Sequence, residues 1–234
     1  MSNAKIARNV NLEKRHAAEK SLEYVRDGMH LGLGSGSTAA IMIELLAQRV
    51  REGLRIQGIP TSEGTRHLAH KLGIPLLSFD SVLSLDLTID GADEADDELN
   101  LIKGGGGAML REKIIASVSR HVIIIVDSSK RCRRLGAFPL PVEVVQFSWR
   151  PIAERIRALG STPVLRMTPY GQPFVTDEGN YILDCPAGEI ADPASLSRQL
   201  HDIPGVMEHG LFVGLASTLI VGHSDRVEVL ERDR

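Results

Sequence analysis

The segment from Asp86 to Lys113, DLTIDGADEADDELNLIKGGGGAMLREK, holds the residues whose types and spacing could do chemistry. An apolar, strand-like run ends at Asp90 and is followed by Asp93. Lys103 then precedes four glycines, and Glu112 lies in the helix-like run that follows. Carboxylates, one ammonium group and a glycine-rich turn are what proton transfer on a small anionic substrate requires. The segment therefore predicts an enzyme.

Each of these residues also has an ordinary structural explanation. Lys103 alone could be a surface lysine, and Glu112 could be an exposed glutamate paired with neighbouring Arg111 or Lys113. Next to Lys103, however, stands a run of glycines whose backbone N–H groups could stabilise an oxyanion: Gly104, Gly105, Gly106 and Gly107. Context thus favours a functional role for both charged residues.

A second glycine-rich turn, from Gly32 to Thr38, follows a strand-like run and opens a helix. Its glycines let backbone N–H groups approach an anion, the helix N-terminus adds a positive dipole, and Ser37 and Thr38 add hydroxyl donors. The pattern fits neither the dinucleotide motif nor the Walker motif. We predict a phosphate site; the alternative is a tight turn with Ser37 as helix cap. The segment Thr61–Thr65 also joins a strand to a helix and could form a second wall or a plain cap.

A metal site is the rival interpretation of the acidic segment, and we expect none. The order of its carboxylates does not match an EF-hand loop, and it contains no histidine. The residues Glu94, Asp96, Asp97 and Glu98 are expected to form a solvated acidic face. His67 and His70 stand three apart on a predicted helix but have no further ligand placed beside them, so we expect surface residues.

Composition limits the class of partner. The net charge of -3 gives no electrostatic footprint for nucleic acid or an anionic membrane, and no apolar run approaches the ~18 residues of a membrane span. Cys132 and Cys185 are too few for a disulfide framework, and the start MSNAKIARN lacks an apolar signal region. Basic neighbours could favour the Cys132 thiolate, but we interpret this cysteine as incidental. A small-molecule enzyme of the cytoplasm is expected.

Short apolar strands alternate with helices along most of the chain, which predicts an α/β fold with a Rossmann-like parallel sheet and helices on both faces. Strands are expected at 29–34, 54–60, 75–79, 83–90 and 121–127, and helices at 11–26, 37–52, 63–72 and 108–119. Two prolines at 139–141 mark a change of pattern. We predict a main catalytic domain of residues 1–138 and 208–234, and a small α+β domain of residues 139–207.

The small domain is expected to hold strands at 142–147 and 163–167, a hairpin over 174–184, and helices near 152–159 and 193–203. The apolar tail at 210–222 is expected to return to the main sheet.

Five segments, in their order and spacing, resemble ribose-5-phosphate isomerase of the A type: GLGSGSTAA, PTSEGT, IDGADEADDELNLIKGGGGAMLREKIIA, VDSSK and FPLPVEV. The resemblance extends from Lys14 to the GLFVG region. It implies interconversion of D-ribose 5-phosphate and D-ribulose 5-phosphate through a cis-enediolate, in the non-oxidative branch of the pentose phosphate pathway. It also implies no metal or organic cofactor, and a homodimer or homotetramer in the cytoplasm.

The resemblance further implies residue roles. Glu112 would move a proton between C1 and C2. Asp90, with Asp93 beside it, would assist ring opening and proton movement at the sugar oxygens. Lys103 and the glycine turn would stabilise the enediolate. Substrate oxygens and phosphate would be held by residues of several loops: Lys14, Gly34, Ser35, Gly36, Ser37, Thr38, Gly104, Gly105, Gly106 and Lys130. Ser35 stands where many relatives carry threonine, which keeps the hydroxyl.

Two other functions stay open. An amino-sugar phosphate isomerase-deaminase with the same loops should bind glucosamine 6-phosphate. A sugar-phosphate sensor domain should carry a fused helix-turn-helix and lack a catalytic carboxylate, and we expect no room for that motif before Asn11. A direct assay with ribose 5-phosphate separates the three.

Overall fold

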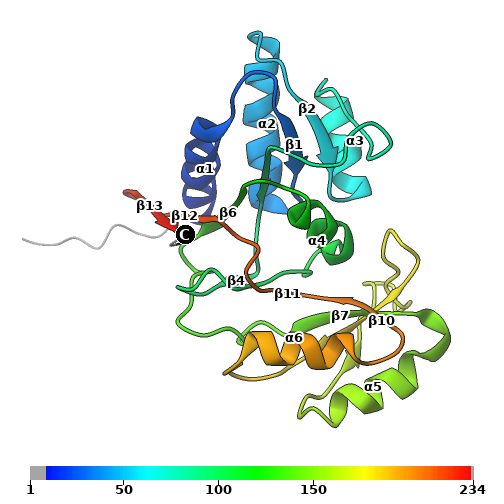
Figure 1. The fold of residues 1–234 in the computed structure, drawn as a ribbon. Helices are drawn as coiled ribbons and strands as arrows, with labels where there is room; N and C mark the ends of the chain where they lie inside the picture. The colour runs from blue at the N-terminus through cyan, green and yellow to red at the C-terminus, as the bar shows by residue number, and fades with distance from the viewer. Residues whose placement is uncertain (1–8, 233–234) are drawn as a thin grey trace, which may run out of the picture. The chain divides into compact units, whose positions relative to one another are not determined.

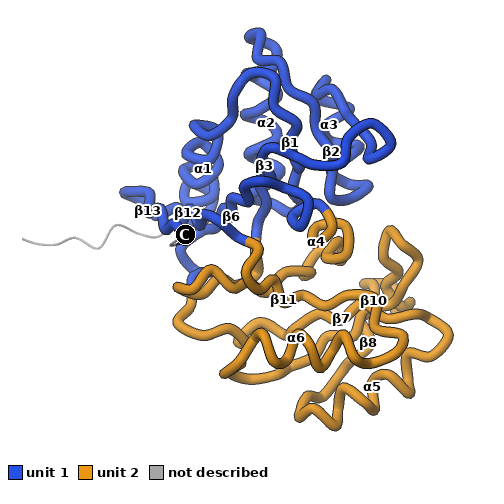
Figure 2. The backbone as a smooth tube through the Cα atoms, in the orientation of Figure 1, with its two compact units in different colours: residues 1–91, 115–131, 216–234 blue, residues 92–114, 132–215 orange. Residues whose placement is uncertain are grey.

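The computed structural model describes residues 9–232, so the N-terminal segment used to predict the location lies outside the described residues. In the described part, no helix has the length and apolar character needed to cross a membrane. The chain divides into two compact units, coloured blue and orange in Figure 2. Unit 1 holds Met1–Gly91, Ile115–Arg131 and Ala216–Arg234, and unit 2 holds Ala92–Ile114 and Cys132–Leu215.

Unit 1 is built around a six-stranded sheet in the order β13-β12-β6-β3-β1-β2. Its strands are β1 (His30–Leu33), β2 (Gln57–Pro60), β3 (Leu87–Asp90), β6 (Val122–Asp127), β12 (Thr218–Gly222) and β13 (Val227–Glu231). Neighbours are parallel except β12 and β13, which are antiparallel. Because β2 and β3 flank β1 on opposite sides, the carboxyl ends of β1 and β3 form a topological switch point, where doubly wound sheets bind ligands.

Helices cover both faces of this sheet. They are α1 (Val10–Ser21), the 3-10 helix η1 (Leu22–Tyr24), α2 (Ser37–Arg51), α3 (Glu63–Lys71) and the end of α4 (Met109–Ser117). Successive strand residues point to opposite faces. Leu31 and Leu33 belong to the core that includes Met42 of α2, whereas a Cβ on Gly32 would lie 2.6 Å from Ile115 of α4. Figure 1 shows α1 beside α2, and the two helices pack together.

Unit 2 combines two antiparallel sheets with the α-helices α5 (Trp149–Arg157) and α6 (Pro193–His201) and the 3-10 helix η2 (Gln146–Ser148). A four-stranded sheet has the order β10-β7-β9-β8, from β7 (Leu140–Val144), β8 (Val164–Leu165), β9 (Tyr181–Cys185) and β10 (Val206–His209). A three-stranded sheet has the order β11-β5-β4, from β4 (Glu94–Ala95), β5 (Leu101–Ile102) and β11 (Leu211–Phe212). The α/β class with an additional small α+β part, as predicted, is confirmed.

Three element predictions were wrong in part. Residues 75–79 form no strand but a single bridge between Gly58 and Leu76, and the chain turns directly afterwards through the hydrogen bond from Ser81 N to Ser78 O. The tail at 210–222 is divided, because β11 pairs with β5 and only β12 joins the main sheet. Of the predicted hairpin, only β9 is a strand, and the first arm contributes the bridge from Val175 to Tyr181.

The boundaries of the two compact units differ from those of the two predicted domains. The division into a catalytic domain and a small domain stays a prediction. Residues 92–114 fall in unit 2 because β5 pairs with β11 and Ile102 packs into the core around Val142 and Leu200. A strand of two residues is too short to show a periodic pattern, so the sequence of β5 does not predict its pairing with β11.

Candidate active site

Unit 1 places Asp90, at the end of β3, beside the turn that follows β1. The Asp90 side chain is buried, and its Oδ1 accepts hydrogen bonds from Ser35 N at 2.9 Å and Gly91 N at 2.7 Å. A Cβ on Gly34 would lie 2.3 Å from this oxygen, so the turn requires glycine there. The parallel pairing of β1 with β3 thus brings two predicted site segments together.

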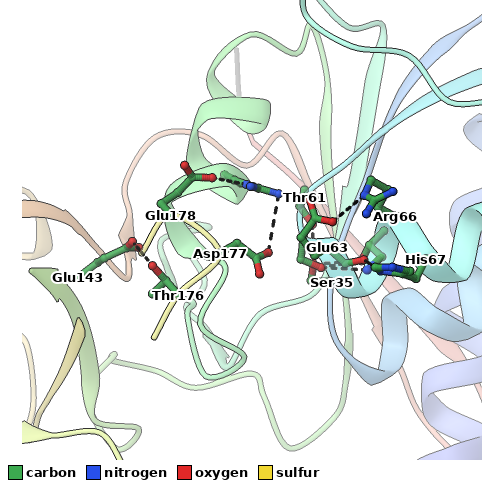
Figure 3. Close-up of polar contacts among 12 residues, drawn as sticks. Ser35, Thr61, Glu63, Arg66, His67, Glu143, Thr176, Asp177 and Glu178 are labelled. Atoms are coloured by element: carbon green, nitrogen blue, oxygen red, sulfur yellow. Dashed lines mark hydrogen bonds and ion pairs between the residues drawn. The ribbon is translucent and has the colours of Figure 1, made fainter. Parts of the chain in front are cut away.

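A cluster of hydroxyl groups joins the turn after β1 to the turn after β2. Ser35 Oγ lies 2.7 Å from Thr61 Oγ1, 2.7 Å from Ser62 Oγ and 3.1 Å from Thr65 Oγ1, and Figure 3 labels Ser35 and Thr61. Thr65 Oγ1 also donates to Gly34 O at 2.9 Å. Ser62 caps α3 by accepting from Thr65 N at 3.1 Å. The second turn therefore both caps its helix and supports the first turn.

The start of α2 has the properties of an anion site. Gly36 is the N-cap with φ of 93°, a left-handed value that favours glycine, and its helix start receives no side-chain cap from residues 9–232. Ser37 is exposed, and its Oγ accepts from Lys14 Nζ at 2.8 Å. Thr38 is buried, and Lys130 is half-buried in the turn after β6. Uncapped N–H groups at a helix start and an adjacent ammonium group suit a phosphate.

Unit 2 contains a buried ion pair between two of the predicted catalytic residues. Lys103 Nζ lies 3.4 Å from Glu112 Oε1, and the side chains are 3% and 7% exposed. Lys103 directly follows β5, and Glu112 lies in the first turn of α4. The alternative of an exposed Glu112 was wrong, because this side chain is buried. Arg111 Nε lies 2.5 Å from Oε1 of Glu178, which Figure 3 labels. Charges this deeply buried require partners of opposite sign.

The glycine turn between Lys103 and α4 is held by Asp93. Asp93 Oδ2 accepts from Gly105 N at 2.8 Å, and a Cβ on Gly105 would lie 2.6 Å from Asp93 Oδ1. Gly104 and Gly107 have φ of 99° and 83°, values that favour glycine. Gly106 has open space where a Cβ would stand. A larger residue would therefore be unfavourable at Gly104, Gly105 and Gly107, but not at Gly106.

Other residues of the acidic segment differ from the expectation. Glu94 and Asp96 are buried, whereas Asp97 and Glu98 are exposed as predicted. Both oxygens of Glu94 accept backbone hydrogen bonds at 2.6 Å, from Gly136 N and Phe138 N. The carboxylate supports a distant loop, and nothing in the local pattern signals that role.

His67, His70 and Cys132 lie outside the acidic segment, and the structure gives none of them a functional role. His67 and His70 are exposed, as predicted, and His67 Nδ1 lies 2.7 Å from Glu63 O. Burial, followed by the charge of Glu94, raises the pKa of the Cys132 thiol to about 11. Its basic neighbours therefore do not favour the thiolate.

Comparison with known proteins bears on the identity of this site. The family model for ribose 5-phosphate isomerase A (phosphoriboisomerase A) matches residues 57–226. The chain is also 52% identical over 225 residues to ribose-5-phosphate isomerase A of Nitrobacter hamburgensis, covering 94% of this chain and 97% of the relative. The chain belongs to the ribose 5-phosphate isomerase A family.

Solved structures agree with this assignment. A D-ribose-5-phosphate isomerase in complex with phospho-erythronic acid is 40% identical, with a TM-score of 0.93 over 96% of this chain and 100% of that chain. Ribose 5-phosphate isomerase from Plasmodium falciparum is 37% identical, with a TM-score of 0.91 over 94% of this chain and 98% of that chain. The predicted isomerase, which interconverts ribose 5-phosphate and ribulose 5-phosphate in the pentose phosphate pathway, is confirmed over the two alternatives.

Proposed function

We propose that Glu112 is the base of this isomerase and that it moves one proton between C1 and C2 of the open-chain sugar through a cis-enediolate. The observation that carries the proposal is the buried pair of Lys103 Nζ and Glu112 Oε1 at 3.4 Å. A carboxylate is a suitable base for a proton next to a carbonyl group, and it can return the proton to the neighbouring carbon. No redox cofactor or metal is needed for that step.

Lys103 and the glycine turn stabilise the negative charge that develops on the enediolate oxygens. The Lys103 side chain is 3% exposed, so water screens its charge little, and its position is fixed before the reaction begins. The backbone N–H groups of Gly104, Gly105 and Gly106 add neutral donors. Asp93 fixes this turn through Gly105 N.

The substrate is held and prepared by residues of unit 1. Asp90 assists ring opening and the movement of a proton between the sugar oxygens O1 and O2, and two backbone N–H groups fix the orientation of its carboxylate. Lys14, Lys130 and the residues Gly34, Ser35, Gly36, Ser37 and Thr38 hold substrate oxygens and the phosphate. The uncapped start of α2 and the contact from Lys14 Nζ to Ser37 Oγ support this role. The phospho-erythronic acid bound to a relative is itself a phosphorylated sugar acid, which supports the same ligand class here.

The isomerase works in the cytoplasm as a homodimer or homotetramer. The family resemblance supports both statements, and the cysteines Cys132 and Cys185 are free thiols, which suits a reducing compartment. Tyr170 of unit 2 is 92% exposed, which gives apolar surface for association. Light scattering of the purified protein measures the oligomeric state.

The substitution Glu112→Gln tests the proposed base. It keeps the size and polarity of the side chain but removes the basic oxygen, so kcat should fall by roughly 100- to 10,000-fold. Binding of ribose 5-phosphate, measured by calorimetry, should persist. Glu154→Gln is the matched control, because Glu154 is an exposed helix residue paired with Arg157. Near-normal turnover of the Glu112→Gln protein would reject the assignment.

A further inference from the structure

The register of β5 and β11 places an aromatic ring beside the catalytic ammonium group. Phe212 pairs with Leu101, and Lys103 N donates to Gly210 O at 2.9 Å. Residues directly opposite one another share a face of the sheet, and so do residues two apart on one strand. Lys103 is therefore the diagonal neighbour of Phe212, and Lys103 Nζ lies 5.5 Å from the ring centroid.

The ring lies in an environment where this contact is strong. Phe212 is 1% exposed and stands first by size among the fully buried side chains of the described residues. A cation over an aromatic ring is attracted to the negative face of the ring, and the attraction grows when water is excluded. Gly210 is also required, because a Cβ there would lie 2.2 Å from Lys103 O. The strand pair thus fixes the backbone of Lys103 while the ring attracts its charge.

A second ammonium group shares the same ring. Lys113 Nζ lies 5.0 Å from the Phe212 centroid, and it donates to Glu208 Oε1 at 2.5 Å and His209 O at 2.7 Å. Burial lowers the pKa of Lys113, and the charge of Glu208 opposes that shift. Glu208 therefore engages Lys113, the sequence neighbour of Glu112, and leaves Lys103 to pair with the base.

The residues around Lys113 also resemble a metal site, since ligand atoms of His201, Glu208 and His209 lie within 4.8 Å of one another. The contacts oppose a metal. Lys113 already binds Glu208 Oε1, and His209 Nδ1 accepts from Leu211 N at 3.2 Å. The proton of the neutral His209 ring is then on Nε2, 3.1 Å from Ser197 Oγ. Burial lowers the pKa of His209 to about 2, so the ring stays neutral, and its Nδ1 lies 3.4 Å from Lys113 Nζ.

We propose that Phe212 is a positioning residue of the isomerase: its buried ring holds the Lys103 ammonium group against Glu112, while Glu208 keeps Lys113 away from that base. The inference rests on the proposed role of Lys103 in stabilising the enediolate. It assigns the ring an electrostatic function in addition to its packing. Weakening the attraction without changing the shape of the ring should therefore slow the reaction.

Site-specific replacement of Phe212 by phenylalanines with one, two and more ring fluorines tests the electrostatic part. Fluorine withdraws charge from the ring face while the ring keeps nearly its size. We expect kcat to fall step by step, by about tenfold in total, with KM changed by less than about twofold. The alkaline limb of the kcat profile should move to lower pH, because a less stabilised ammonium group loses its proton more readily.

Two controls separate packing, positioning and the proposed function. The same fluorinated residues at Phe147, which is fully exposed, should leave kcat and the pH profile unchanged. Thermal melting of each protein shows whether it is folded. If Lys103→Met abolishes turnover but fluorination at Phe212 changes neither kcat nor the alkaline limb, the inference is overturned and the proposed function stands. Normal turnover of Lys103→Met would instead overturn the proposed role of Lys103.

Discussion

The glycine turn after β1 in unit 1 and the glycine turn after β5 in unit 2 look alike in sequence but carry different side chains. Each follows a strand and leads into a helix, α2 and α4 respectively. The first has exposed Ser37 and a network of hydroxyl groups around Ser35. The second is flanked by the buried charges of Lys103 and Glu112.

The difference matches two physical tasks. A phosphate arrives with its charge fully formed, and uncapped helix N–H groups with hydroxyls can take over its hydration. The charge of an enediolate exists only during the reaction, so it is best met by groups already held in place away from water. We infer that the first turn mainly binds and the second mainly does chemistry.

Replacing one glycine of each turn by alanine should be costly in the first turn and should have little effect in the second. In Gly34→Ala the new Cβ would lie 2.3 Å from Asp90 Oδ1, whereas in Gly106→Ala it would meet nothing within 4 Å. We expect Gly34→Ala to lower kcat/KM about 100-fold, since small displacements of site residues are costly. It should also destabilise the fold by about 1–3 kcal/mol. Kinetics and urea unfolding of both proteins measure this, and equal effects would contradict the difference in packing.

Removing the ammonium group next to the first turn should affect binding more than chemistry. Lys14→Met leaves the α2 start without its charged neighbour, and we expect KM to rise about tenfold with kcat changed by less than about threefold. Arg15→Met is the control, because Arg15 lies on the same helix and pairs with exposed Glu19 at 2.8 Å. Steady-state kinetics of both variants measure kcat and KM. If Lys14→Met lowered kcat and left KM unchanged, Lys14 would act in the chemical step.

A smaller, pH-dependent effect is expected from Glu143, a buried carboxylate whose hydrogen-bond partners are neutral groups. Glu143 Oε1 accepts from Thr176 Oγ1 at 2.7 Å and from Asn180 Nδ2 at 3.0 Å. Figure 3 draws the contact between Glu143 and Thr176. Burial is the main cause that raises the pKa of Glu143 above 4.5. The folded state thus holds this proton more tightly than the unfolded state, so stability is fully present below pH 4.5 and falls as pH rises through the raised pKa.

Replacement of Glu143 should remove that dependence. Glu143→Gln keeps an acceptor for Thr176 and carries no charge, so its melting temperature should decline less than that of the parent protein between about pH 5 and pH 8. Melting curves across this range measure the slopes. Parallel slopes in the two proteins would show that Glu143 does not titrate differently on unfolding.

The smallest effect is expected from chelation. If Lys103 and the glycine turn supply the electrophile, EDTA should leave the activity of the isomerase unchanged. Activity assays before and after dialysis against EDTA measure this. A loss that returns with added metal would show that a metal ion, rather than the second turn alone, stabilises the enediolate.

Much of unit 1 could be predicted from sequence because its signals are local. Helix α2 begins at Ser37 and α3 at Glu63, where glycine and Ser62 mark the helix starts. The run at 75–79 is an exception, because an apolar run can pack against a sheet edge with only one bridge, and its own pattern does not distinguish this from a strand. The strands β4, β5 and β11 have two residues each, too few to show any period.

The sequence by itself determined the family, the α/β class, the order of most elements and the identity of Glu112, Lys103 and Asp90 as candidates. Those follow from motifs and periodicities that neighbouring residues carry together. The tertiary structure decided which charges meet: that Lys103 pairs with Glu112, that Glu208 takes Lys113, and that Phe212 lies beside both lysines. Such contacts join segments that are distant in the sequence. They depend on the register of paired strands and on burial, and a short stretch of chain determines neither.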